Sequence, residues 1–326
     1  MKAKQFKLFQ CCVAVKGIKN GIIIDFQRNA IHNVSNQLID LLAEYSKKSI
    51  YELFEDFKAS KKLLKKHIRY FIENELVIIS DEIDRYPFLS TVFLKPAIID
   101  TLCMELESFD VDLKTFLLRD VNELGINYMK LILKKDEINN LNKILSVLET
   151  SKIKGIVLYL EFNIKIAEEL ETLVINNPRI SQVVFCNSIQ GLTLSNCDGK
   201  FYFENLSLEE LFDNKTIESV NDFVLNQNIY NEALQYNLMF NKSLFIDSLG
   251  HVKKYRGDLE IYGNIKIEKI NNILENKDFY AFWNISKDQT EVCKDCEFRY
   301  ICPDGRIPYK MNSENLYYKH KTACNY

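Results

Sequence analysis

Four cysteines close to the C-terminus constrain this chain more than any other feature. Cys293, Cys296, Cys302 and Cys324 follow the spacing C-x2-C-x5-C-x21-C. A C-x2-C pair brings two thiolates together in one tight turn, and four soft thiolates favour Zn²⁺ or an iron–sulfur cluster. The sequence therefore predicts one metal centre held by these four residues, which is either a [4Fe–4S] cluster or Zn²⁺.

The other five cysteines are scattered and suggest no second centre. They are Cys11, Cys12, Cys103, Cys186 and Cys197. An odd total of nine in a chain of 326 residues argues against a secreted disulfide scaffold. The first seven residues include lysines but lead into no unbroken apolar stretch, so no signal peptide is expected. We expect a cytoplasmic protein with reduced thiols, in which the three cysteines at positions 103, 186 and 197 are buried or incidental.

Length and charge limit the remaining possibilities. A chain of 326 residues exceeds one ordinary domain, so two or three domains are expected. The 42 basic and 45 acidic residues give a net charge of −3, which provides no overall basic field for nucleic acid. No apolar run reaches the roughly 18 residues of a membrane-spanning helix. We therefore expect neither nucleic acid nor a membrane among the partners.

Residues 1–81 are predicted to form a winged-helix-like domain. Strand-like segments cover residues 6–15, 21–26, 30–32 and 76–79, and Asn20-Gly21 is typical of a hairpin turn. Between residues 34 and 72 apolar side chains recur at helical spacing, which predicts three helices. Ser49 and Glu52 form a capping box that begins the second of them.

The third predicted helix is basic, and its role is open. Its candidate contacts are Lys62, Lys65, Lys66 and Arg69, and a neighbouring edge strand contains Ile31. The simplest interpretation is a solvated helix face. Alternatively, the strand accepts an added peptide strand while the helix attracts an acidic peptide. This arrangement resembles the PqqD-like leader-peptide recognition element of ribosomally made peptide systems. A winged-helix DNA-binding regulator with a zinc ribbon is a third alternative, disfavoured by the acidic balance.

Residues 82–235 alternate between strands and helices, which predicts a parallel sheet. The first strand is expected at residues 97–100. Later strands begin near Tyr128, Gly155 and Gln182, so two successive repeats each span 27 positions. A leucine-rich repeat lacks support because its leucine consensus and asparagine ladder are missing. The fold class is therefore mixed α/β, with a partial α/β barrel in the middle of the chain.

A partial barrel of this kind resembles the core of radical SAM enzymes. Those enzymes hold a catalytic [4Fe–4S] cluster with a C-x3-C-x2-C motif after the first strand, and S-adenosylmethionine binds the open iron. Here that region contains only Cys103, and the motif occurs nowhere in the sequence. The resemblance therefore implies a degenerate barrel without its catalytic cluster, and S-adenosylmethionine is not expected. No glycine-rich phosphate loop is present either.

Residues 236–326 resemble a SPASM domain. The C-x2-C-x5-C run with its distant fourth cysteine matches that module, as do the I-D-x-x-G-x-V pattern within residues 244–252 and the G-N-I pattern at residues 263–265. A full SPASM domain holds two auxiliary clusters. The positions that would supply the second carry Tyr255 and Gly305, so the resemblance implies one retained centre.

The whole chain resembles the grasp-with-spasm peptide maturase family, through its Cys11-Cys12 start and its C-terminal cysteines. That resemblance implies an accessory protein for a ribosomally synthesised and modified peptide of the graspetide type. It would bind the precursor's leader and act with an ATP-grasp ligase, without autonomous catalysis. An active radical or redox enzyme is the alternative. The four histidines are far apart in sequence, and we expect His32, His67, His251 and His320 to be surface or core residues.

Overall fold

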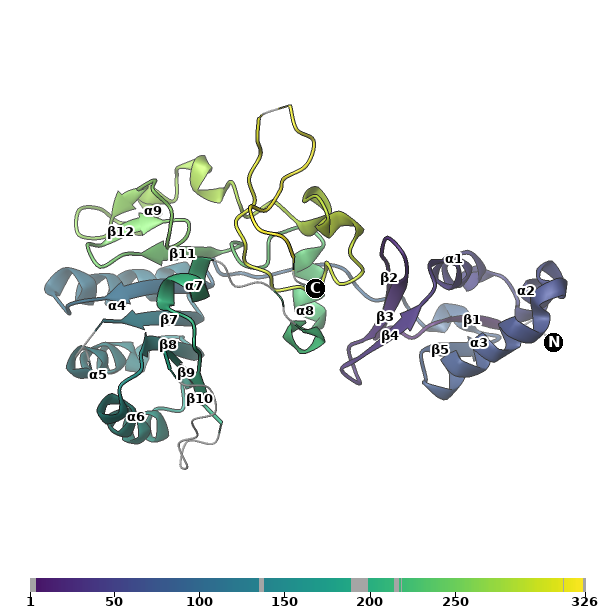
Figure 1. Cartoon of the computed structure of the whole chain (residues 1–326), viewed down its shortest axis with the longest axis horizontal. Helices are drawn as coiled ribbons and strands as arrows, with labels where there is room; N and C mark the ends of the chain where they lie inside the picture. The colour runs from purple at the N-terminus through teal and green to yellow at the C-terminus, as the bar shows by residue number, and fades with distance from the viewer. Residues whose placement is uncertain are drawn as a thin grey trace.

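The computed structural model describes residues 4–134, 138–188, 199–213, 217, 219–312 and 314–324. Figure 1 shows an N-terminal domain at one end and a large sheet at the other, with the C-terminal segment between them. The predicted incidental cysteine Cys197 lies outside the described residues. Within the described residues, no helix is long and apolar enough to cross a membrane.

Two small sheets form the N-terminal domain. β1 (Gln5–Leu8) pairs antiparallel with β5 (Val77–Ser80), while β2 (Cys12–Lys16), β3 (Gly21–Asp25) and β4 (Ala30–Val34) form an antiparallel meander. The single strand expected at residues 6–15 was therefore wrong. A turn divides it, because the amide of Cys12 bonds the carbonyl of Phe9, and the two halves pair with different strands.

Three helices cover one face of the meander. They are α1 (Asn36–Glu44), α2 (Ile50–Asp56) and α3 (Lys61–Glu73). The predicted capping box of Ser49 and Glu52 is confirmed at the start of α2. Phe6, Leu53 and Phe71 are among the buried residues between the helices and the strands. The opposite face of the meander packs against the C-terminal segment, so this small sheet is covered on both sides.

An eight-stranded sheet dominates the rest of the chain, in the order β10-β9-β8-β7-β6-β11-β12-β13. Its parallel strands are β6 (Thr101–Leu106), β7 (Tyr128–Leu133), β8 (Gly155–Glu161), β9 (Ile180–Cys186), β10 (Phe201–Phe203) and β11 (Ser243–Ile246). β12 (His251–Lys253) and β13 (Gly263–Asn264) extend it antiparallel. The protein is thus a mixed α/β structure with a large, mostly parallel sheet.

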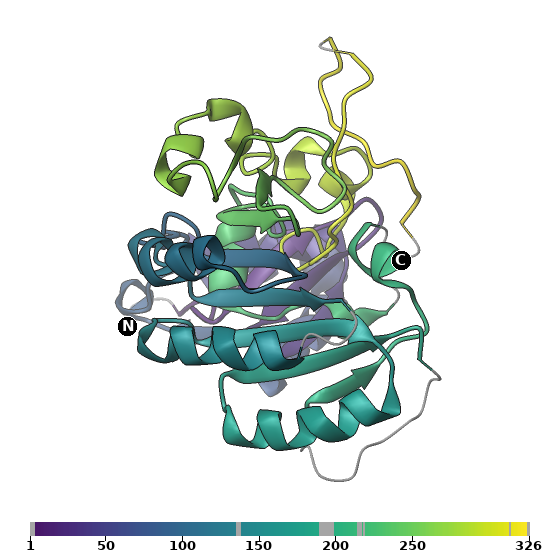
Figure 2. The same cartoon turned by 90° about the vertical axis from the view of Figure 1, so that its left-hand side faces the viewer.

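The predicted repeat of 27 residues matches the strand register. Thr101 lies opposite Tyr128, and Tyr128 lies opposite Gly155. The third repeat is shorter than predicted, since β9 begins at Ile180, which lies opposite Ile156. A bulge after this pair places Gln182 opposite Val157. Each repeat carries its helix on the same face of the sheet (Figures 1 and 2): α4 (Val111–Leu124), α5 (Ile138–Val147) and α6 (Ile164–Asn176).

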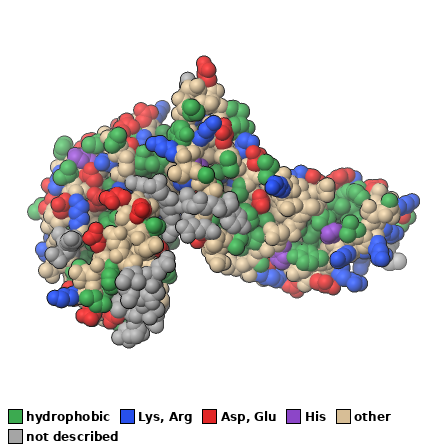
Figure 3. Space-filling model, in the orientation of Figure 1, with side chains coloured by type: hydrophobic (Ala, Val, Ile, Leu, Met, Phe, Trp, Pro, Cys, Tyr) green, Lys and Arg blue, Asp and Glu red, His purple; other side chains and the backbone are tan. Residues whose placement is uncertain are grey.

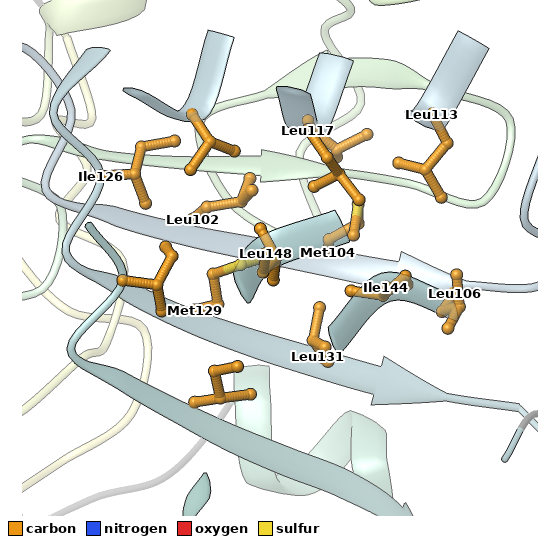
Figure 4. Close-up of a cluster of buried hydrophobic side chains, with 14 of the residues drawn as sticks. Leu102, Met104, Leu106, Leu113, Leu117, Ile126, Met129, Leu131, Ile144 and Leu148 are labelled. Carbon is orange, nitrogen blue, oxygen red and sulfur yellow. The ribbon is translucent and has the colours of Figure 1, made fainter. Parts of the chain in front are cut away.

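The main core lies between these helices and the sheet. Figure 4 shows Leu102, Met104 and Leu106 of β6 pointing to the same side as Met129 and Leu131 of β7. Leucine and isoleucine side chains from the helices complete the layer. Alternate residues of the same strands face the other side of the sheet, where the polar residues described below gather.

The first strand begins later than the sequence indicates. Residues 97–100 were predicted as strand, but β6 begins at Thr101. The amides of Ile98 and Ile99 bond the carbonyl of Leu124 at the end of α4, and the amide of Asp100 bonds the carbonyl of Lys242. The run is thus an irregular connection, in which Ala97, Ile99 and Asp100 are buried and Ile98 is exposed. As a consequence, Cys103 lies within the strand and not in the loop after it.

The C-terminal third is built from short elements. α7 (Leu208–Asp213) and α8 (Gln227–Ala233) precede β11, and α9 (Ile270–Ile273) follows β13. β11 and β12 form the strand-turn-strand expected for residues 244–252, with Gly250 at φ 88° in the turn. In the region of the four cysteines, two isolated bridges join Thr290 to Tyr318 and Tyr309 to Lys319.

Candidate metal centre

The first two cysteines of the motif lie on one turn of 3₁₀-helix at Cys293–Asp295. The amide of Cys296 donates to the carbonyl of Cys293 at 3.0 Å, which closes the C-x2-C turn. Val292, immediately before it, adopts φ 67°, a conformation that β-branched residues rarely occupy. Strained backbone of this kind is concentrated at functional sites.

Three thiols of this region are largely buried, and two of them accept hydrogen bonds from the backbone. Burial raises the pKa of Cys293, raises that of Cys296 to about 11 and raises that of Cys302 to about 12. The backbone N–H of Phe298 donates to Cys296, and that of Asp304 donates to Cys302, so each sulfur accepts from the residue two positions later. Such outer hydrogen bonds orient ligands, and metal binding replaces the thiol protons.

A cavity of about 200 Å³ opens beside the first cysteine. Cys293 and Cys324 line it, together with Arg306 and His320. The structure therefore brings the last cysteine of the motif to the first, although 30 residues separate them in sequence. The donor set and this space fit a metal ion or a cluster.

A buried ionic group lies against the cavity. Asp304 is 4% exposed, and its carboxylate accepts from the guanidinium of Arg306 at 2.7 to 3.1 Å and from Nζ of Lys287 at 3.1 Å. Burial acts to raise the pKa of Asp304, but the bonds from Arg306 and the charge of Lys287 outweigh it and hold that pKa far below its usual range. Two buried cations beside one carboxylate leave a net positive charge next to the thiols, which favours thiolates.

His320 is a member of the same group that the motif does not contain. Its ring nitrogen, the Sγ of Cys293 and a carboxylate oxygen of Asp304 all lie within 4.8 Å of one another. The His320 side chain is 6% exposed, and Nδ1 lies 3.3 Å from the carbonyl oxygen of Ile307. Burial, with the charge of Lys287, lowers the pKa of His320 to about 4, so the ring is neutral at pH 7.

The other two cysteines face the N-terminal domain. Cys296 and Cys302 pack against an apolar cluster that contains Val15, Ile22 and Ile301. A polar contact joins the same two segments, since Nη1 of Arg299 donates to the carbonyl of Lys16 at 2.7 Å. The cysteine turn is therefore part of the interface that holds the β2-β3-β4 meander.

Tyr255 and Gly305 are the two positions that the SPASM resemblance predicts to lack the ligands of a second cluster, and both form packing contacts. Tyr255 stacks on Phe282 with ring centroids 5.9 Å apart, and both contact Phe240. The other position, Gly305, packs on Met239, whose side chain would lie 3.1 Å from an added Cβ. Side-chain packing therefore fills the surroundings of both residues.

Cys103 lies on the sheet face opposite the helices, between Phe245 of β11 and Lys130 of β7. Burial raises the pKa of its thiol to about 12. The loop after β6, residues 107–110, contains no cysteine. On this same face a cavity of about 400 Å³ is lined by Lys130, Tyr159 and Glu204, and Gly305 of the C-terminal segment borders it.

A second group of possible ligands lies in the N-terminal domain. The sulfurs of Cys11 and Cys12 are 3.8 Å apart and near the carboxylate of Asp25. That carboxylate already accepts from the amides of Gln27 and Arg28 and from the Arg28 guanidinium. Three donors thus already engage this carboxylate, which disfavours it as a metal ligand.

The predicted peptide-binding residues divide into two groups. Lys62, Lys65, Lys66 and Arg69 are exposed on α3, and among the described residues none of them forms an ion pair. Ile31 lies on the edge strand β4, but its side chain turns to the apolar cluster beneath the meander. It can therefore take part in peptide binding through its backbone only.

Sequence reasoning missed His320, Asp304, Lys287 and Arg306. The first was expected to be a surface or core residue, and the others carried no recognisable motif. Their role depends on contacts between segments far apart in sequence, such as His320 with Cys293. The one available signal was the Asp304-x-Arg306 pair, which begins two residues after Cys302.

Comparison with known proteins adds little. No family model matches the chain, and no curated protein matches it. Among solved structures, SuiB of Streptococcus suis bound to S-adenosylmethionine has a TM-score of 0.36 and 10% identity, covering 92% of this chain and 95% of its own. A second structure of SuiB has a TM-score of 0.35 and 10% identity, covering 91% and 94%. Similarity at this level supports no functional argument.

Proposed function

We propose that this chain is a cytoplasmic accessory protein for the maturation of a ribosomally synthesised peptide of the graspetide type. It binds the precursor's leader with its N-terminal domain and acts with an ATP-grasp ligase, which supplies the bond-forming chemistry. The grasp-with-spasm relationship rests on the sequence resemblance. The observation that carries the proposal is the juxtaposition of a free strand edge and a basic helix in the N-terminal domain.

The strand edge is β4. Among the described residues it pairs only with β3, so its outer edge is available to an added strand. α3 runs beside β4, as a contact between the two elements shows. The hydroxyl of Tyr70 in α3 lies 2.9 Å from Nδ1 of His32 in β4, and their ring centroids are 6.0 Å apart. A peptide that pairs with β4 would therefore place alternate side chains against α3.

The charge of α3 indicates the kind of peptide. Its exposed cations are free of acidic partners among the described residues, and Figure 3 shows Lys and Arg side chains along the lower and outer edges of this domain. Unpaired surface cations attract an acidic ligand and speed its association. We infer that the leader is acidic where it crosses α3.

The metal centre has a supporting role in this proposal. Cys296 and Cys302 pack beneath the same meander whose edge is β4. A bound metal would fix the cysteine turn and thereby the sheet that receives the leader. No catalytic step is assigned to this chain, since the loop after β6 lacks the cysteines that a radical enzyme of this type requires.

The test begins with affinity purification of the tagged full-length protein from its producing cells, followed by mass spectrometry. We expect a small precursor peptide and an ATP-grasp ligase to copurify. Fluorescence anisotropy with the labelled leader then measures affinity for the wild type and for the triple variant Lys62→Glu/Lys66→Glu/Arg69→Glu. The variant should bind the leader about tenfold more weakly or worse, because it replaces three attractive charges with repulsive ones. A tenfold change in Kd corresponds to ~1.4 kcal/mol of binding free energy.

A matched control replaces three exposed lysines near the large sheet, at positions 152, 154 and 165, with glutamate and so reverses their charge. It changes the net charge equally and should leave leader affinity unchanged. Equal weakening by both variants, or the absence of both partners, would contradict the proposal. Tight, salt-sensitive binding of a DNA duplex by the wild type would instead support the regulator alternative.

A further inference from the structure

The unpartnered nitrogen of His320 is the strongest unexplained feature outside the cysteine motif. Its Nε2 is buried, and among the described residues it has no hydrogen-bond partner. The nearest oxygen of Asp304 lies 3.9 Å away, beyond hydrogen-bonding distance. A buried polar atom without a partner costs free energy, so its presence points to a group that the polypeptide itself does not supply.

The other ring nitrogen fixes the tautomer. The carbonyl oxygen of Ile307 can only accept, so Nδ1 of His320 carries the proton and donates to it. Nε2 therefore presents a lone pair. Histidines that bind metals almost always donate their other ring N–H to a carbonyl or carboxylate, which is the arrangement seen here.

Donors that suit the same ion lie close to the His320 ring. His320, Cys293 and Cys324 line one cavity, and the ring nitrogen and the Cys293 sulfur are within 4.8 Å. A tetrahedral Zn²⁺ with bonds of about 2.0 to 2.3 Å holds its donor atoms about 3.5 to 3.8 Å apart, so a small closure of the site suffices. Asp304 is the third member of this group, but Arg306 and Lys287 already engage its carboxylate.

We propose that Nε2 of His320 is a metal ligand, and that the centre is a mononuclear site of three sulfurs and one nitrogen. Cys293 and Cys324 supply two sulfurs. One of the two cysteines beside the N-terminal domain, Cys296 or Cys302, supplies the third. The set corresponds to Cys₃His, a common composition of structural zinc sites. This inference concerns the metal alone and holds whether or not the protein binds a leader peptide.

X-ray absorption of the full-length protein loaded with Zn²⁺ alone tests the proposal. We expect three sulfur ligands and one nitrogen ligand in the wild type. His320→Ala should weaken Zn²⁺ binding, measured by competition with a chromophoric chelator, by more than about 100-fold, because loss of an outer-shell partner alone costs 10–100-fold. His67→Ala, which removes an imidazole from α3, should leave the affinity unchanged.

A rescue variant separates ligand loss from misfolding. His320→Cys offers a different donor at the same position and should restore tight binding with four sulfur ligands. Co²⁺ loading should then give an absorption spectrum shifted from that of the wild type. Four sulfurs in the wild type, together with unchanged affinity in His320→Ala, would overturn the assignment. An iron–sulfur cluster with the same spectrum in both proteins would overturn it as well.

Discussion

Individual thiols in this chain differ in whether other possible metal ligands lie close to them. Cys293 lies beside a cavity and within reach of His320 and Asp304, whereas Cys103 lies within a strand near Lys130 and Arg256 and joins no group of possible ligands among the described residues. Both thiols have a raised pKa, so the pKa alone does not distinguish a ligand from an incidental cysteine. The neighbouring donors do.

This difference gives a prediction about metal content. Cys293→Ser should abolish stoichiometric metal binding, because it removes a sulfur that lies within 4.8 Å of a ring nitrogen of His320 and shares a cavity with Cys324. Cys103→Ser should retain the wild-type stoichiometry. Elemental analysis of protein purified without oxygen measures both. Loss of metal from the Cys103 variant would show that the sheet face holds a centre of its own.

At the scale of elements, the sequence predicted best where periodicity is local. The spacing between strands predicted the 27-residue offset of β7 and β8, which the pairing of Tyr128 with Gly155 confirms. The same spacing was wrong for the next interval, since β9 begins at Ile180 and not near Gln182. The prediction also failed at residues 97–100, whose apolar composition resembles a strand although their amides bond α4 and Lys242. An apolar composition predicts that a segment is largely buried. Whether that segment forms a strand depends on the residues far along the chain with which its backbone bonds.

The β3–β4 turn provides a prediction about stability. Asp25 is fully buried and accepts hydrogen bonds from the amides of Gln27 and Arg28 and from the Arg28 guanidinium. Asp25→Ala should lower the free energy of unfolding of the N-terminal domain by about 1 to 3 kcal/mol at pH 7, since these donors lose their acceptor. Urea denaturation followed by circular dichroism measures the change. An effect below about 0.5 kcal/mol would contradict this account of the turn.

The same carboxylate should make stability depend on pH. Burial acts to raise the pKa of Asp25, but the bonds from Arg28 and Gln27 outweigh it and leave the pKa lowered. A carboxylate with a lowered folded-state pKa stabilises the fold above its unfolded value of about 3.9, and this contribution is lost as the pH falls further. The difference between wild type and Asp25→Ala should therefore shrink below about pH 4.

At the scale of the whole molecule, one apolar cluster joins the N-terminal domain to the C-terminal segment. It contains residues of the meander and of the cysteine turn. Phe298, two residues after Cys296, is 5% exposed in that cluster and stacks on Phe223 with ring centroids 4.4 Å apart. The N-terminal domain therefore packs both on the cysteine turn and on a second group of residues, Ile217, Phe223 and Tyr230.

Removal of the metal should loosen this junction. In the presence of a chelator, amide hydrogen exchange in β2 and β3 should accelerate, while that of β7 and β8 stays unchanged, because only the former pack on the cysteine turn. Phe298→Ala should produce the same pattern with the metal still bound. Uniform acceleration throughout the chain, or none in β2 and β3, would contradict the coupling.

The contact between Arg299 and Lys16 also affects how the protein is made. The two residues are 283 positions apart. At a synthesis rate of about 5–20 residues per second, the meander emerges from the ribosome roughly 15 to 60 seconds before its covering segment. Its apolar underside is exposed during that interval. Nascent chains of this protein should thus depend on chaperone binding near the N-terminus until the last cysteines have been translated.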